Sequence, residues 1–171
     1  MTGALLAALV ALAAGAAEPL RPAAGLGLGA VAIESGSGEH PLAPALGAWG
    51  RLPLGPVLHV ELETALARRS EGGALAAFDE RWYRAALGLG CSAGSRRARV
   101  AASLGPAFGL RVSRIEAAQR WRASSAAAGL RWRGGLLLPL WTHGQLGLLA
   151  GGSTRGRAVD FDLLLEGGVR W

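Results

Sequence analysis

The chain has 171 residues, of which 51% are hydrophobic, and its 18 basic and 12 acidic side chains give a formal net charge of +6. This length suits one domain with a core, and the hydrophobic content excludes a disordered chain. The basic residues are all arginines spread along the chain, so nucleic acid is not an expected partner, and no apolar run beyond the N-terminus reaches the roughly 18 residues of a helical membrane span.

The N-terminal segment has the pattern of a secretory signal peptide. Residues 4–14 are apolar, small residues follow as far as Ala17, and the chain then turns polar at Glu18. We therefore expect a signal peptide over residues 1–17 and a mature domain over residues 18–171. Because residues 1–3 lack Arg and Lys, a short buried helix is the alternative. The lone Cys91 cannot form an intrachain disulfide, and no cysteine is placed for a lipid anchor.

Eight segments can be drawn as β-strands. Three of them, within residues 58–66, 99–113 and 160–171, alternate between apolar and polar residues, which is typical of a strand with two unlike faces. Their length suits a tilted membrane strand of about 9–11 residues better than a soluble strand of about five or six. The other five predicted strands are Gly25–Ile33, Ala45–Leu54, Trp82–Cys91, Ala126–Leu138 and Gln145–Gly152.

The connections between these strands alternate in length, as expected when both termini lie in the periplasm. The predicted outer loops are Glu34–Pro44, Arg68–Arg81, Arg114–Ser125 and the shorter Ser153–Arg157. The predicted periplasmic turns are Pro53–Pro56, Ser92–Arg97 and Pro139–His143. A soluble sandwich has no reason to alternate its loop lengths in this way.

The last strand carries apolar residues at alternate positions and ends on an aromatic one. These residues are Phe161, Leu163, Leu165, Val169 and Trp171, and Gly167 interrupts the series. In this the chain resembles the small eight-stranded outer-membrane β-barrel proteins, over roughly residues 20–171. The resemblance implies an all-β, eight-stranded, antiparallel up-and-down transmembrane barrel in the bacterial outer membrane. It also implies that these five residues form the signal read by the barrel-assembly machinery.

An eight-stranded barrel encloses an interior just wide enough for side chains, so we expect no open pore. Charged side chains that point inward must then be paired, because an unpaired buried charge is costly. The expected internal charge network is Arg51, His59, Glu61, Glu63, Arg84, Arg99, Arg111, Arg131, Arg133, Asp160, Asp162 and Glu166.

The outer ends of the strands are rich in arginine. We expect lipopolysaccharide phosphates as a partner for these side chains, with an ordinary solvated rim as the alternative. The candidate contacts are Arg68, Arg69, Arg81, Arg114, Arg120 and Arg122. An interfacial aromatic belt is expected from Trp82, Tyr83, Trp121, Trp141 and Trp171.

Catalytic chemistry finds little support in the sequence. His40 falls in an outer loop, His143 in a periplasmic turn and His59 inside a strand, so the three cannot share a site, and no serine is placed beside the pair His59 and Glu61. Cysteine and histidine do not occur at metal-ligand spacing, so we expect no catalytic residue, no metal and no cofactor. The glycines Gly25, Gly27 and Gly29 lack the strand and helix context of a nucleotide-binding loop and are read as small inward residues.

The expected function is therefore that of a structural or interaction barrel, monomeric, surrounded by outer-membrane lipid and presenting loops to the outside. Two alternatives remain open: an outer-membrane lipid-modifying enzyme and a soluble periplasmic β domain. A helical arrangement of Ala74–Leu87 and Val112–Trp121 is the main competitor for the fold, because alanine favours helices.

Overall fold

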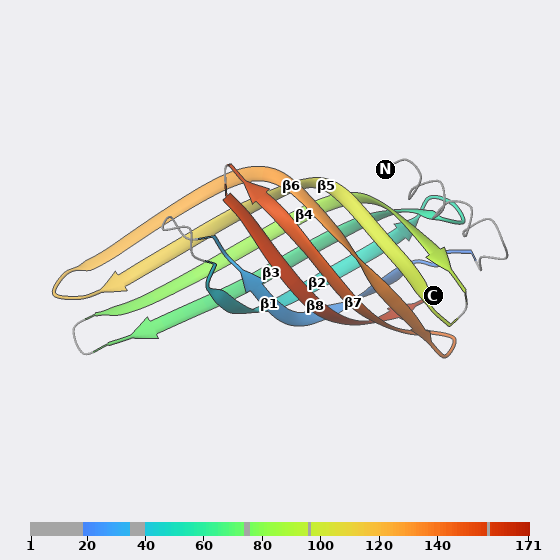
Figure 1. The fold of residues 1–171 in the computed structure, drawn as a ribbon, viewed down its shortest axis with the longest axis horizontal. Coiled ribbons are helices and arrows are strands. Elements are labelled where there is room, and N and C mark those ends of the chain that lie inside the picture. Colours follow the sequence, from blue (N-terminus) through green and yellow to red (C-terminus); the bar gives the residue numbers. More distant parts are fainter. Residues whose placement is uncertain (1–18, 35–39, 74–75, 96, 157) are drawn as a thin grey trace.

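The computed structural model describes residues 19–34, 40–73, 76–95, 97–156 and 158–171, and the predicted signal peptide lies outside them. The described residues form eight strands (Figure 1). Their bounds are β1 Ala23–Ala32, β2 Leu42–Pro53, β3 Leu58–Gly72, β4 Ala77–Gly94, β5 Arg99–Glu116, β6 Arg120–Leu140, β7 Gly144–Arg155 and β8 Ala158–Arg170. No helix long and apolar enough to cross a membrane occurs among the described residues.

The strands form a closed barrel in which each strand runs antiparallel to the next. β8 closes the sheet by pairing with β1, with Ala23 opposite Arg170 and Ala32 opposite Phe161. Closure matters because an open strand edge cannot satisfy its backbone groups in hydrocarbon. The eight-stranded, all-β, antiparallel barrel predicted from the sequence is confirmed.

The wall of the barrel has two unlike faces, as the alternation predicts. Leu26 is 70% exposed on the outside, whereas Leu164 is buried inside between the exposed Leu163 and Leu165. Further exposed apolar side chains on the outside are Leu28, Leu46, Leu62, Leu89, Leu104, Phe108, Leu136, Leu148 and Val169. An apolar outside and a polar inside reverse the order found in soluble proteins and match a barrel in lipid.

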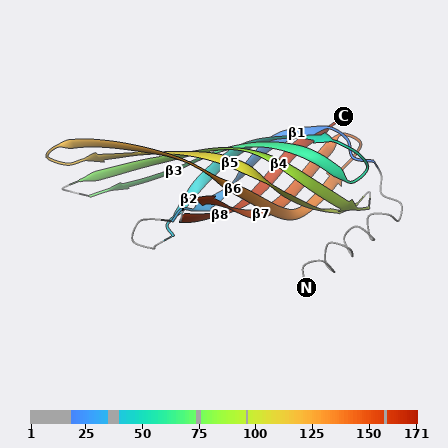
Figure 2. The same ribbon diagram turned by 90° about the horizontal axis from the view of Figure 1, so that it is seen from above.

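β3, β4, β5 and β6 are longer than the other strands and continue past one end of the barrel (Figures 1 and 2). There they form a four-stranded sheet, which we call the blade, made of residues 68–72, 77–81, 111–116 and 120–129. The prediction of long outer loops over Arg68–Arg81 and Arg114–Ser125 is therefore wrong. The connections are reduced to residues 73–76 and 117–119.

The sequence did not reveal the blade because its residues lie beyond the closed barrel and most of them are exposed on both faces. Where neither face is buried, apolar and polar residues need not alternate, and the period-two signal disappears. Cross-strand pairing nevertheless continues without a break, for example from Arg111 opposite Ser125 to Glu116 opposite Arg120. The helical alternatives over Ala74–Leu87 and Val112–Trp121 are also wrong, since their described residues lie in strands or in the turns between them.

Candidate functional site

The centre of the barrel holds a network of buried ion pairs. Glu63 on β3 accepts hydrogen bonds from Arg84, Arg131 and Arg133, which come from β4 and β6. Nε of Arg131 and Nη1 of Arg133 each lie 3.1 Å from Oε2 of Glu63. Asp162 on β8 completes the group, 2.8 Å from Nη1 of Arg84 and 2.9 Å from Nη2 of Arg131. The network therefore ties β3, β4, β6 and β8 together across the interior.

A second set of pairs lies on the side of Glu63 that faces away from the blade. Glu61 accepts hydrogen bonds from Arg51 of β2 and from Oγ of Ser103, the latter at 3.1 Å. Arg133 bridges the two sets, because its Nη1 also lies 3.4 Å from Glu61 and its Nη2 donates to Glu166. Every one of these charged side chains has an opposite charge in contact, which is what their burial demands.

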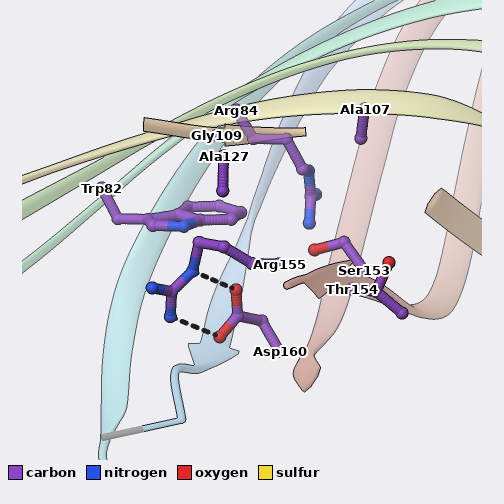
Figure 3. A pocket seen from close by; sticks show the side chains of 9 residues that line it. All are labelled: Trp82, Arg84, Ala107, Gly109, Ala127, Ser153, Thr154, Arg155 and Asp160. Carbon is purple, nitrogen blue, oxygen red and sulfur yellow. Dashed lines mark hydrogen bonds and ion pairs between the residues drawn. The ribbon is translucent and has the colours of Figure 1, made fainter. Parts of the chain in front are cut away.

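Toward the blade, ion pairs close the interior around a small cavity (Figure 3). Arg155 pairs with Asp160 at 3.5 Å, and the ring of Trp82 lines the same cavity. The cavity measures about 10 Å³, enough for one water at most. Nearby, Glu80 accepts hydrogen bonds from Arg111 and from Ser113.

Apolar side chains pack on both sides of the central charges. The larger cluster lies toward the blade and consists of Val31, Ile33, Ala43, Ala45, Ala65, Ala67, Trp82 and Leu164. A smaller one, made of Ala101, Leu137 and Leu149, lies toward the end opposite the blade. The interior is thus layered, with ion pairs between two apolar layers.

The structure places all twelve side chains of the expected internal network on the inward face. Eleven of them are buried and Arg111 is half-buried. Arg99 lies at the end opposite the blade, where it lines a small cavity with Arg51, Gln145 and Arg170. Four contributors were not anticipated, namely Glu80, Trp82, Ser103 and Arg155. Glu80 and Trp82 could have been found, because they stand four and two residues from the inward Arg84 and so share its face.

The three histidines lie apart. His59 is buried against Gly90, and neither of its ring nitrogens has a hydrogen-bond partner among the described residues. His40 lies beside Phe161, with ring centroids 6.4 Å apart, and Nδ1 of His143 lies 3.2 Å from the carbonyl oxygen of Arg170. Phe161 and Arg170 are nine residues apart on β8, about 30 Å along the strand. His40 and His143 therefore lie at opposite ends of the barrel.

The outward face of the blade carries a cluster of arginines. Arg68 lies directly opposite Arg81, and Arg114 lies directly opposite Arg122. Asp79 sits among them, with Oδ1 2.9 Å from Nε of Arg68 and Oδ2 3.4 Å from Nη2 of Arg81. The hydrogen bond from Arg68 lowers the pKa of the Asp79 carboxyl. Like charges placed directly opposite each other are unfavourable, and the Asp79 carboxylate contacts only two of these four guanidinium groups, those of Arg68 and Arg81.

This arginine cluster lies just beyond the apolar wall. The next outward pair toward the barrel is Leu66 opposite Tyr83, one repeat of about 7 Å along the strands. A groove of about 290 Å³ runs along the same part of the blade, and Arg68, Asp79 and Arg114 contribute to its lining. Of the six predicted lipopolysaccharide contacts, five share this outward face. Arg69 is on the other face and pairs with Glu71.

The inward face of the blade presents an apolar row. Phe78 lies opposite Ile115, and Ile115 lies opposite Trp121, which is 66% exposed. The expected aromatic belt is therefore wrong for two members. Trp82 is buried inside the barrel and Trp121 stands on the blade, whereas Tyr83, Trp141 and Trp171 are exposed at the ends of the apolar wall.

No protein-family model matches the chain, and no curated protein matches it either. Solved structures of the same fold do match. Neisserial surface protein A has a TM-score of 0.68 and 10% sequence identity, covering 88% of this chain and 97% of that one. Ail, the attachment invasion locus protein of Yersinia pestis, has a TM-score of 0.64 and 15% identity over 88% and 97% of the two chains. Ail has also been solved with the heparin analogue sucrose octasulfate.

The outer membrane protein OprG of Pseudomonas aeruginosa has a TM-score of 0.61 and 14% identity, covering 90% of this chain and 97% of that one. At such identities the likeness establishes the fold. The resemblance to small eight-stranded outer-membrane barrels is confirmed at that level.

Proposed function

We propose that the protein is an interaction barrel of the bacterial outer membrane, which holds its blade above the membrane surface as the part that meets other molecules. The observation that carries this proposal is the division of the molecule into two parts. Lipid suits the apolar wall of the barrel, whereas the blade is polar on its outward face and continues β3 to β6 beyond that wall.

The interior supports a role without an open pore. Charged pairs and two apolar layers occupy it, and the cavity at its outer end measures about 10 Å³. An ion or solute would have to break pairs such as those of Glu63 with Arg131 and Arg133 in order to pass. The structure does place a serine beside His59 and Glu61, contrary to the sequence expectation, because Ser103 lines the same small cavity. The pairing nevertheless favours a structural role over catalysis, since Ser103 donates to Glu61, Glu61 is held by Arg51, and neither ring nitrogen of His59 has a hydrogen-bond partner among the described residues.

The outward face of the blade is proposed to bind phosphate groups of lipopolysaccharide. Arg68 and Arg81 lie about 7 Å along the strands beyond the apolar wall, and Arg114 and Arg122 lie one repeat further out, about 14 Å beyond it. These levels suit headgroups, and guanidinium groups bind phosphate through charge-assisted hydrogen bonds. Arg68 and Arg81 already share the carboxylate of Asp79. Arg114 and Arg122 lie directly opposite each other and form no ion pair among the described residues, so a shared anion explains this second pair better than a solvated rim. Binding of a polyanion by Ail, which shares the fold, agrees with this proposal.

Membrane placement is tested by fractionating cell envelopes by density and by comparing gel migration of heated and unheated samples. A folded outer-membrane barrel should appear in the dense fraction and should migrate differently after heating. Recovery in the soluble periplasmic fraction would favour the soluble β domain instead. Lipid A mass spectra from cells with and without the protein should be identical, and a modified lipid A would support the enzyme.

Lipopolysaccharide binding is tested separately on the folded barrel. Changing Arg114, Arg120 and Arg122 together to Gln should lower affinity at low salt by at least about tenfold, because hydrogen bonds to charged groups contribute about 1.5–3 kcal/mol each. Arg69→Gln is the matched control, since Arg69 is on the inward face of the blade and pairs with Glu71. Unchanged affinity in the triple variant would exclude these phosphate contacts and leave the membrane placement untouched.

A further inference from the structure

The blade has a long open edge on β6. β6 pairs with β7 from Arg131 to Leu140, and Gly129 and Leu130 still lie against Thr154 of β7. Residues 120–128 pair with β5 on one side and with no described strand on the other. These nine residues extend about 31 Å along the strand. Open edges of this kind are usually protected by charged side chains, Pro or a bulge, and the arginines on this edge, Arg120 and Arg122, are confined to its tip. Here residues 124–129 are Ser, Ala and Gly alone.

The polar backbone groups on this edge belong to alternate residues. The amide nitrogen of Leu130 points toward β7, because it donates to Oγ1 of Thr154 at 2.8 Å. The N–H and C=O groups of successive residues point to opposite sides of a strand. The backbone groups of the other even-numbered residues therefore point to the same side as those of Leu130, which is the open side. Those residues are Arg120, Arg122, Ser124, Ala126 and Ala128. The open edge therefore offers five donors and five acceptors in register.

We propose that this edge pairs with the same edge of a second copy of the chain. Antiparallel pairing about a twofold axis at Ser124 brings even residues opposite even residues, as continuous hydrogen bonding requires. Arg122 then lies opposite Ala126 of the second copy, and Arg120 lies opposite its Ala128. On the other face Trp121 lies opposite Ala127. The large residues 120–122 of one copy thus meet the small residues 126–128 of the other, and no arginine lies directly opposite another.

The symmetry of this pairing determines where the two barrels lie. A twofold axis perpendicular to the sheet reverses the strand direction, so the two barrels point away from each other. With the barrel placement proposed above, on which this step rests, the two copies belong to two facing membranes. Because the blades overlap side by side, the gap between the membranes is about the length of one blade, roughly 35 Å. The pairing is thus a contact between membranes and leaves each barrel a monomer within its own.

Cysteine crosslinking tests the register. In protein purified from outer membranes and carrying Cys91→Ala, Ser124→Cys should form a disulfide-linked dimer when diamide oxidises the two thiols. Directly opposed Cα atoms lie about 5.5 Å apart, within disulfide range. Ser125→Cys is the matched control, because two such residues lie diagonally at about 7–8 Å and on the other face. We expect about tenfold more dimer from Ser124→Cys, a ratio set by this geometry.

Two vesicle populations distinguish contact between membranes from contact within one membrane. One population carries the barrel with an added tag and the other carries it untagged, and heat-dependent migration first verifies insertion in both. Crosslinks between tagged and untagged chains should form only after mixing, together with vesicle clustering seen by light scattering. Failure of insertion would contradict the barrel placement, whereas insertion without mixed crosslinks or clustering would overturn the proposed pairing.

Changes at Ala126 provide the final test. Ala126→Pro removes an amide from the open edge and none from the β5 ladder, so it should abolish clustering, while Ala126→Ser should not. Ala126→Glu, opposite Arg122 of the second copy, should increase clustering and Ala126→Arg should decrease it. Clustering insensitive to all of these changes would overturn the proposal. Binding of an unrelated extended peptide at this edge, without self-crosslinking, would also overturn it.

Discussion

Arg131 and Glu63 face each other across the interior of the barrel, with Nε 3.1 Å and Nη2 3.4 Å from the two carboxylate oxygens. Arg131 comes from β6 and Glu63 from β3, so the pair links strands that are not neighbours in the sheet. Both side chains are almost fully shielded from solvent. The pair therefore resists flattening of the barrel and joins opposite walls.

Removing the charge of Glu63 should be strongly destabilising. Glu63→Gln leaves Arg84, Arg131 and Arg133 to share fewer carboxylates, and breaking a buried pair costs about 3–5 kcal/mol. The measurement is urea unfolding from lipid vesicles. Glu116→Gln is the control, since Glu116 is exposed on the blade and its change should stay within about 0.5 kcal/mol. A loss of similar size in both variants would contradict the central role of Glu63.

The sequence predicts the barrel well where one face meets lipid and the other does not. In β3, β5 and β8 this contrast produces the alternation from which strands, faces and the inward charges can be read. Residues two and four positions apart on a strand share a face, so Glu80 and Trp82 can also be assigned to the inward face once Arg84 is placed there. The specific partners cannot all be read in this way, because Glu63 and Asp162 meet arginines from strands that are not their neighbours, through closure of the barrel. Arg51, by contrast, lies directly opposite Glu61 on the neighbouring strand.

Lipid exposure of β8 can be measured by an arginine scan. Leu163→Arg should cost about 2–4 kcal/mol in folding free energy if this residue lies near the bilayer midplane, and the cost should fall toward Val169. Leu164 is buried inside, so Leu164→Ala should cost about 2–5 kcal/mol through lost packing. The loss at Leu164 should not change in vesicles of different lipid thickness. Absence of any depth dependence over Phe161, Leu163, Leu165 and Val169 would contradict a lipid-facing surface.

Two tryptophans that the sequence analysis treated alike should respond differently to truncation. Trp82 is 1% exposed within the outer apolar layer, and the guanidinium carbon of Arg84 lies 4.8 Å from the centre of its ring. Trp82→Ala should therefore cost about 3–5 kcal/mol. Trp121→Ala, on the blade, should change stability by less than about 0.5 kcal/mol. If the two variants lost equal free energies of unfolding in urea, Trp121 would have to be packed against another group as closely as Trp82 is.

The paired strands of the blade can be distinguished from loops by an engineered disulfide. Ser113 lies directly opposite Ala123, and directly opposed residues have Cα atoms within disulfide range. With Cys91→Ala, the double change Ser113→Cys and Ala123→Cys should oxidise within one chain and leave migration of the folded barrel unchanged. Ser113→Cys with Ala127→Cys places the second thiol four residues from register and serves as the control. Equal oxidation of the two pairs would indicate a mobile loop.

Deletion of Trp171 should impair assembly more than stability. Its amide nitrogen donates to the carbonyl oxygen of Pro22 at 3.1 Å, next to the pair Ala23 and Arg170 where β8 meets β1. Its indole is 60% exposed on the same face as Val169, a position suited to the boundary between lipid and water. We predict that the deletion lowers the amount recovered in the outer membrane of cells much more than it lowers stability after refolding in detergent.

Two variants isolate the role of the terminal aromatic ring. Trp171→Phe keeps an aromatic side chain and should restore the yield in the outer membrane. Trp141→Ala removes another exposed tryptophan at the same end of the barrel, 88% exposed in the turn between β6 and β7, and should leave the yield unchanged. If Trp141→Ala lowered the yield as much as deletion of Trp171, the effect would reflect a general need for interfacial aromatics. Equal yields of the Trp171 deletion and the parent would remove the assembly role altogether.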